Sequence, residues 1–193
     1  MCGRFALRNP QQVKEKLSIS TSVEPRYNIA PGQKVLVTDN NTHFIKWGFT
    51  PYWAEKPFNL INARAETLAE KPSFKNSSRC LIPADGWYEW KETNGKKIPY
   101  FLHLEDKTFY FAGVYGGYRG EVGCAIVTTD ASSNLQNVHT RMPCIIKSDE
   151  HKFWLEGKDI NTLDTSIGER IKFFEVSTYV NNPQNDNERC IEI

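Results

Sequence analysis

The sequence predicts an α+β fold dominated by strands, with a mainly antiparallel sheet curled toward a barrel and short helices at its periphery. Short apolar and aromatic runs recur along the chain between turn residues, of which Asn94-Gly95 is the strongest hairpin signal. The 193 residues are 39% hydrophobic and 12% aromatic, a composition typical of folded proteins. No internal repeat, low-complexity run or linker divides the chain, so we expect a single domain over residues 1–193.

The first third of the chain is expected to form a strand, a helix and a hairpin. Asn9 and Pro10 suit the N-cap and the first position of a helix. Asp39-Asn40-Asn41 separates two strand-like runs and favours a tight turn between them. In chain order, the expected elements are a strand at 3–7, a helix at 10–17, and strands at 34–38 and 43–47.

The rest of the chain alternates short helices with strand pairs. Pro72 should end a helix that begins at Asn62. The turn residues Asn94-Gly95 and Gly116-Gly117 each predict a hairpin, so neighbouring strands should be antiparallel. The expected helices are 62–71, 73–78, 132–137 and 149–155, and the expected strands are 86–91, 98–104, 108–115, 123–129, 144–147 and 172–178.

Charge and cysteine usage exclude several classes of protein. The formal net charge of +1 is too small to indicate nucleic-acid binding by bulk charge alone. We expect no membrane span and no secretory signal, hence a cytoplasmic, nucleoid-associated protein. The five cysteines include no CxxC pair and no zinc-ligand spacing, so we expect neither a metal nor another cofactor. Cys80, Cys124 and Cys144 lie in apolar surroundings and are expected in the core.

Cys2 is the first candidate for chemistry. Removal of Met1 would leave an α-amine and a thiol on adjacent carbons, both with a reactive fraction near neutral pH. Such a 1,2-aminothiol condenses with an aldehyde to an imine, which the thiol closes into a thiazolidine ring. The alternative is that Cys2 is the second residue of a frayed tail.

Three further residues are candidates for proton transfer or positioning. Glu89 lies in an aromatic strand, where desolvation would raise its pKa and make it a general acid/base; alternatively it faces solvent. His139 lies in a polar loop and can exchange protons near neutral pH. Asn62 starts an expected helix, and its side chain could serve only as the cap.

Arginines and aromatic residues offer a surface for nucleic acid. Arginine is the better bidentate partner for phosphate, and five arginines fall beside the candidates above. They are Arg4, Arg26, Arg64, Arg79 and Arg141. The aromatic stretch 47–53, which includes Trp53, either packs in the core or exposes flat rings on a loop for stacking.

Taken together, these motifs resemble the SRAP (SOS response-associated peptidase) family. Each block is weak alone, but the ordered set over residues 2 to about 155 is specific. Trp87 and Thr140 depart conservatively from the family pattern. The matching blocks are Met-Cys-Gly-Arg at 1–4, Tyr-Asn-Ile-Ala-Pro-Gly at 27–32, Trp-Gly-Phe at 47–49 with Pro51 and Trp53, Asn-Ala-Arg-Ala-Glu-Thr at 62–67, Arg-Cys-Leu-Ile-Pro-Ala at 79–84, Gly-Trp-Tyr-Glu-Trp at 86–90, Phe-Ala-Gly at 111–113 and His-Thr-Arg-Met-Pro at 139–143.

The resemblance implies a protein that binds single-stranded DNA at abasic sites and captures the sugar aldehyde with Cys2 as a thiazolidine crosslink. Separately from the resemblance, we expect a monomer. The resemblance also implies that Asn62 orients Cys2 and the sugar. It assigns acid/base catalysis of imine formation and reversal to Glu89, and proton donation for sugar-ring opening to His139. It further implies a Cys2-dependent peptidase step that removes residues ahead of Cys2. The implied DNA contacts are Arg4, Asn28, Trp53, Arg64, Arg79 and Arg141.

Two other functions are compatible with parts of the sequence. Class II glutamine amidotransferases also begin Met-Cys-Gly, and their freed cysteine attacks an amide. This chain shows no counterpart of their downstream glutamine-pocket motifs, and their mechanism leaves the ordered blocks unexplained. The second alternative is a non-covalent reader of modified bases in DNA that uses the aromatic loop.

Overall fold

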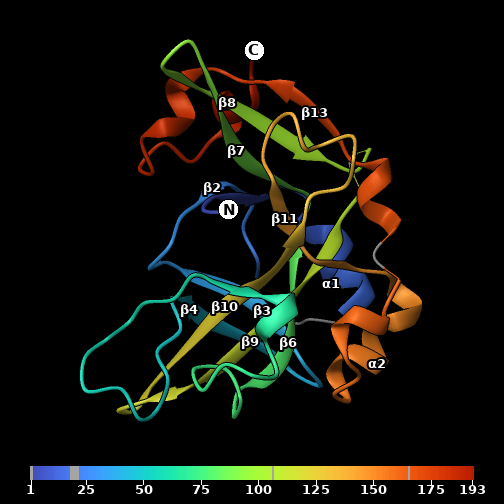
Figure 1. Ribbon diagram of the computed structural model, residues 1–193. Helices are drawn as coiled ribbons and strands as arrows, with labels where there is room; N and C mark the ends of the chain where they lie inside the picture. Colours follow the sequence, from blue (N-terminus) through green and yellow to red (C-terminus); the bar gives the residue numbers. More distant parts are fainter. Residues whose placement is uncertain (1, 18–21, 106, 165) are drawn as a thin grey trace.

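A computed structural model describes residues 2–17, 22–105, 107–164 and 166–193. Its strands form two sheets, one above the other in the view of Figure 1. The five-stranded sheet has the order β13 (Lys172–Glu175), β8 (Lys96–His103), β7 (Gly86–Thr93), β1 (Phe5–Leu7) and β2 (Arg26–Ile29).

The second sheet closes on itself, because β10 pairs with both β4 and β9. Its ring runs β10 (Glu121–Asp130), β4 (Thr42–Trp47), β3 (Lys34–Thr38), β6 (Ser78–Ala84), β9 (Phe109–Tyr118) and back to β10. Three short strands extend it, namely β5 (Asn62–Arg64), β11 (Arg141–Pro143) and β12 (Ile145–Ile146). Most pairings are antiparallel, and β4 and β5 run parallel to β10. The predicted strand-dominated α+β class and its curling toward a barrel are confirmed.

The helices are short. In the ranges that the structure describes, the α-helices are α1 (Pro10–Leu17), as predicted, and α2 (His151–Leu155). The remaining helical turns are of the 3₁₀ type, at Ala65–Thr67, Ser148–Glu150, Ile160–Thr162, Ser166–Arg170, Thr178–Asn181 and Glu188–Ile191. None of the helices of the described residues is long and apolar enough to span a bilayer.

Hairpins were predicted better than helices. The pairs β3–β4 and β7–β8 are confirmed, and Asn94 and Gly95 both have positive φ, as a primed turn requires. The turn between β9 and β10 was predicted at the wrong place. It lies at Arg119-Gly120, where both φ angles are positive, while the glycine pair at 116–117 lies inside β9.

The predicted helices at 62–71, 73–78 and 132–137 are wrong. Asn62 begins the strand β5, which pairs with β10 in the register Ile126↔Asn62. Ile126 also donates its backbone N–H to the carbonyl of Ile61 at 3.0 Å. This pairing with a distant strand outweighs the local capping signal at Asn62. Residues 72–76 and 133–138 form turns instead of helices.

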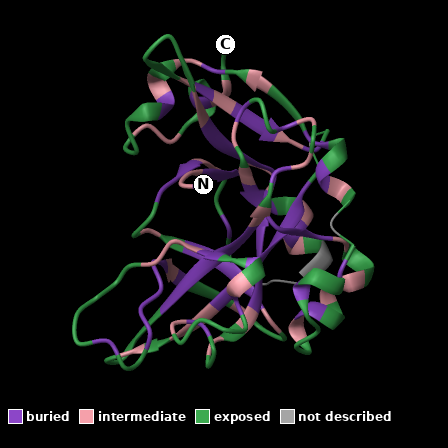
Figure 2. Ribbon diagram, in the orientation of Figure 1, coloured by how far each residue is buried: buried purple, intermediate pink, exposed green. Residues whose placement is uncertain are grey.

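The main hydrophobic core lies between the two sheets. Aromatic rings cross from one sheet to the other: the Phe5 ring centroid lies 5.2 Å from that of Trp47 and 5.9 Å from that of Phe111. Figure 2 shows the strands that face this interior as buried. Cys80, Cys124 and Cys144 are buried, as predicted. We infer that the shared core makes residues 1–193 one domain.

Candidate active site

Cys2 is built into the core between the sheets. Its side chain is fully buried and belongs to the same cluster as Phe5 and Trp87. Directly after it, the Arg4 carbonyl accepts a hydrogen bond from the Tyr88 amide at 2.9 Å, and the ladder continues at Phe5↔Trp87. This antiparallel register extends the first residues of the chain along β7 toward Glu89. The frayed-tail alternative for Cys2 is therefore wrong.

Glu89 faces the same interior as Cys2. Side chains alternate along a strand, so Glu89 and the buried Trp87 share one face of β7. Only 3% of Glu89 is exposed, and burial raises the pKa of its carboxyl from 4.5 to about 7. The predicted desolvation of Glu89 is confirmed, and a solvent-facing glutamate is excluded. A carboxyl of this pKa can both give and take a proton near neutral pH.

Burial also acts on the Cys2 thiol. Burial first, and the negative charge of Glu89 second, raise the pKa of this thiol well above its ordinary value. The Sγ atom lies 3.9 Å from the carbonyl oxygen of Arg4. The thiol is therefore held in its neutral form and oriented by the backbone, next to a carboxyl group that can exchange its proton.

Asn62 faces the Cys2 cluster from the barrel. In the β5–β10 ladder it stands beside Ile126, a member of that cluster, while Ala63 points to the opposite side. Trp47 donates its indole N–H to the Ile61 carbonyl at 2.8 Å and fixes the strand at this point. The Asn62 side-chain nitrogen and oxygen are both buried and have no hydrogen-bond partner among the described residues. A buried amide in this condition suits a ligand that supplies the missing partners.

His139 is anchored to the same core through its backbone. Its N–H donates to the carbonyl of the buried Leu135 at 3.1 Å. Its Nδ1 lies 2.9 Å from the Arg141 backbone nitrogen and 3.1 Å from the Arg141 carbonyl oxygen; we assign the shorter contact as a bond donated by the Arg141 N–H, which puts the proton of a neutral ring on Nε2. Burial lowers the pKa of the imidazole, so the neutral form dominates at pH 7. A neutral imidazole with its proton on Nε2 is a hydrogen-bond donor.

Arg141 is engaged in an ion-pair network. Its Nη1 lies 2.6 Å from Glu66 and 2.7 Å from Asp130, and its Nη2 donates to the Thr128 carbonyl at 2.8 Å. The network joins β11 to β10 and to the turn after β5. No sequence pattern marks Glu66 as its partner.

Arg4 and Asn28 bind each other. Arg4 donates to the Asn28 side-chain oxygen at 2.7 Å and to the Val180 carbonyl at 2.9 Å. Asn28 is completely buried, and its amide nitrogen lies within hydrogen-bond distance of the carbonyls of Val180, Asn182 and Asn185, among which it shares its two protons. This placement does not support the predicted DNA contact of Asn28, because its side chain has no exposed surface and its bonding capacity is used inside the protein.

The remaining predicted DNA contacts are Arg64, Arg79 and Trp53. Arg64 is exposed on the same face of β5 as Asn62. Arg79 stacks over the Trp154 ring, 4.2 Å from its centroid, and lines a pocket of about 290 Å³ with Glu66. Trp53 is 45% exposed, which favours the loop placement of this residue over burial in the core.

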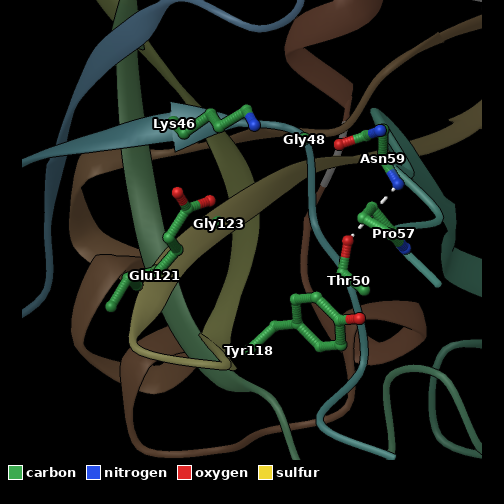
Figure 3. A pocket seen from close by; sticks show the side chains of 9 residues that line it. Lys46, Gly48, Thr50, Pro57, Asn59, Tyr118, Glu121 and Gly123 are labelled. Carbon is green, nitrogen blue, oxygen red and sulfur yellow. Dashed lines mark hydrogen bonds between the residues drawn. The ribbon is translucent and has the colours of Figure 1, made fainter. Parts of the chain in front are cut away.

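A second pocket, of about 160 Å³, lies at the base of the loop that carries Trp53 (Figure 3). Lys46 and Glu121 both line it, and the Thr50 hydroxyl accepts the Asn59 N–H at 3.4 Å. None of the ten predicted site residues lines this pocket. In the described part of the chain, no group of three or more His, Cys, Asp or Glu side chains could hold a metal ion.

The fold and site define a class: a strand-dominated protein in which a cysteine at the start of the chain is buried between two sheets beside a carboxyl of raised pKa. Residues 1–183 match the model of one family, SOS response associated peptidase (SRAP). The chain belongs to this family, as its motifs predicted.

The relatives agree with this assignment over their whole length. The abasic site processing protein YoqW of Bacillus subtilis is 35% identical, with 100% of this chain and 99% of YoqW covered. The abasic site processing protein YedK of Escherichia coli is 32% identical, with the same coverage. A crystal structure of a Bacteroides thetaiotaomicron protein has a TM-score of 0.80 over 98% of both chains; at 22% identity this similarity concerns the fold alone.

Proposed function

We propose that this protein recognises abasic sites in single-stranded DNA and attaches itself covalently to them through Cys2 once Met1 has been removed. The observation that carries the proposal is the burial of Cys2 beside Glu89, whose pKa of about 7 suits proton transfer at neutral pH. The printed function of the relatives, abasic site processing, agrees with it.

The reaction consists of two balanced steps. The freed α-amine of Cys2 attacks the aldehyde of the ring-opened sugar, and the resulting carbinolamine loses water to give an imine. The thiol then adds to the imine carbon, and its proton ends on the ring nitrogen of the thiazolidine. In this scheme Glu89 gives a proton to the departing hydroxyl and takes one back from the nitrogen as the imine forms. In the second step it gives a proton to the imine nitrogen and takes the thiol proton, so that its own protonation state is restored. A thiol held neutral by burial suits the second step, because its proton leaves only when the carbon–sulfur bond forms.

Two further residues have supporting roles in this scheme. Asn62 offers a donor and an acceptor to the sugar hydroxyls or to the phosphate group, which accounts for its buried and unpartnered amide. His139 donates its Nε2 proton to the ring oxygen of the closed sugar, and so favours the aldehyde form. Arg64 and Trp53, both exposed, supply a phosphate contact and a stacking surface. Under the same proposal, the peptidase step removes residues ahead of Cys2, and the protein works at the nucleoid as a monomer.

The test uses protein whose intact mass proves that Met1 is absent. Mixing it with single-stranded DNA that contains one abasic site should give an adduct that survives denaturing electrophoresis and has the mass of the two partners minus one water. The Cys2→Ala variant should bind the same DNA reversibly, with an affinity that falls as salt rises, and give no adduct. An unchanged mass for the Met1-free wild type would refute covalent capture.

Two other outcomes would favour the alternatives. Release of ammonia from glutamine would indicate an amidohydrolase. Equal affinity of the wild type and Cys2→Ala for an intact duplex with modified bases, without any covalent product, would indicate a reader.

A further inference from the structure

We propose that the segment 177–192 at the C-terminal end of the chain, here called the clasp, positions Cys2 for the reaction without contributing a reacting group. This inference rests on the proposed function. It concerns residues that no sequence pattern marked, and part of the clasp, including Asn185 and Asp186, lies beyond the residues that match the family model.

The clasp is bound to strand β2. The Asp186 carboxylate accepts the backbone N–H groups of Tyr27 at 2.6 Å and Asn28 at 2.9 Å, and forms an ion pair with Arg26. These bonds take the place that a neighbouring strand would fill at the edge of the sheet. A single carboxylate therefore joins the clasp to β2 at three points.

Asn28 carries this attachment into the interior. Its amide nitrogen lies within hydrogen-bond distance of three clasp carbonyls and shares its two protons among them: those of Val180 at 3.1 Å, Asn182 at 3.1 Å and Asn185 at 2.6 Å. Its oxygen accepts Arg4 at 2.7 Å. One buried side chain thus links three residues of the clasp to Arg4, which lies two positions after Cys2.

Arg4 completes the connection. Besides Asn28, its Nη1 donates to the Val180 carbonyl at 2.9 Å, while its own carbonyl accepts Tyr88 N–H. The guanidinium lies 5.7 Å from the Trp90 ring centroid, and the Trp90 indole N–H donates to Asn181 of the clasp at 2.8 Å. Arg4 is therefore held through its backbone by β7 and through its side chain by the clasp.

The consequence concerns rate and not affinity. Ring closure requires the amine, the thiol and the aldehyde carbon to meet in one geometry, and a displacement of about 1 Å can cost roughly 100-fold in rate. Loosening the clasp frees Arg4 and lets the first residues move relative to Glu89. Non-covalent DNA binding, which depends on surface contacts elsewhere, should change little.

The test compares two variants with a matched control, all without Met1. Asp186→Ala removes the attachment to β2. Asn28→Asp keeps an acceptor for Arg4 but replaces the donor to the three carbonyls. The control Asp159→Ala makes the same change as Asp186→Ala at a carboxylate outside the clasp. The Asp159 carboxylate accepts the Asn161 N–H at 3.0 Å. Thermal unfolding gives the folded fraction of each variant, so that rates refer to folded protein.

The expected result is a crosslinking rate at saturating abasic DNA that is roughly 10- to 100-fold lower for Asp186→Ala and Asn28→Asp. Asp159→Ala should keep the wild-type rate, and the dissociation constants measured in a Cys2→Ala background should be equal for all. If the wild-type protein forms the crosslink and every folded clasp variant forms it at the wild-type rate, the inference is wrong. Asp186→Ala alone decides the matter if Asn28→Asp does not fold. If wild-type protein forms no adduct, the proposed function itself fails.

Discussion

At pH 8, the Glu89→Gln variant should have a higher free energy of unfolding than the wild type. This difference between the two proteins should vanish in acid. The folded-state pKa of Glu89 is raised from 4.5 to about 7 by burial. Because the pKa is raised in the folded state, the contribution of Glu89 to the free energy of unfolding is fully favourable below pH 4.5 and is lost as the pH rises through 7. The difference corresponds to about 3 kcal/mol, and no allowance for solvent screening is needed because the side chain is 3% exposed.

The assay is urea unfolding of the wild type and Glu89→Gln at several values between pH 4.5 and 8.5. The free energy of unfolding of the variant minus that of the wild type should rise by about 3 kcal/mol across this range, mostly between pH 4.5 and about 7, with half of the rise reached at about pH 6 and a plateau above pH 7. Taking the difference cancels the titration of all other groups. A difference that stays constant with pH would show that Glu89 is ionised in the folded protein, and would refute its role as a general acid. In the same series, the crosslinking rate of the wild type should titrate near pH 7.

Three other changes probe the surroundings of the site. Gly86→Ala should destabilise the protein by about 1–3 kcal/mol or more in urea unfolding, because the new Cβ would lie 2.0 Å from the Phe101 ring; a neutral result would contradict the packing described between β7 and β8. Arg141→Met should lower the free energy of unfolding by about 1–3 kcal/mol at neutral pH. The difference from the wild type should become smaller in acid, because Arg141 lowers the pKa of Glu66 and the stabilisation from this pair is lost as the pH falls; a difference that grows in acid would contradict the ion pair between Arg141 and Glu66. Trp53→Ala should leave the unfolding midpoint unchanged while weakening single-stranded DNA binding by about 1–3 kcal/mol in fluorescence anisotropy, and loss of stability instead would place the ring in the core.

Much of the fold could be predicted from local patterns. Strand periodicity and turn residues are properties of neighbouring positions, so the hairpins β3–β4 and β7–β8 followed directly from the sequence. The helix expected at Asn62 failed for the opposite reason. The local sequence around Asn62 favours a helix cap and a three-residue strand only weakly. Pairing with β10, whose residue Ile126 lies far away along the chain, stabilises the strand over the helix.

The sequence by itself determined the strand-dominated fold class, the family, and which residue types could carry the chemistry, with Cys2 first among them. Only the tertiary structure decided that Cys2 and Glu89 are buried together, that the Asn62 amide has no hydrogen-bond partner within the described part of the chain, and that Asn28 binds the clasp instead of facing outward. The physical reason is that burial and hydrogen-bond satisfaction depend on which distant segments surround a side chain. Those segments become neighbours only when the sheets close and pack.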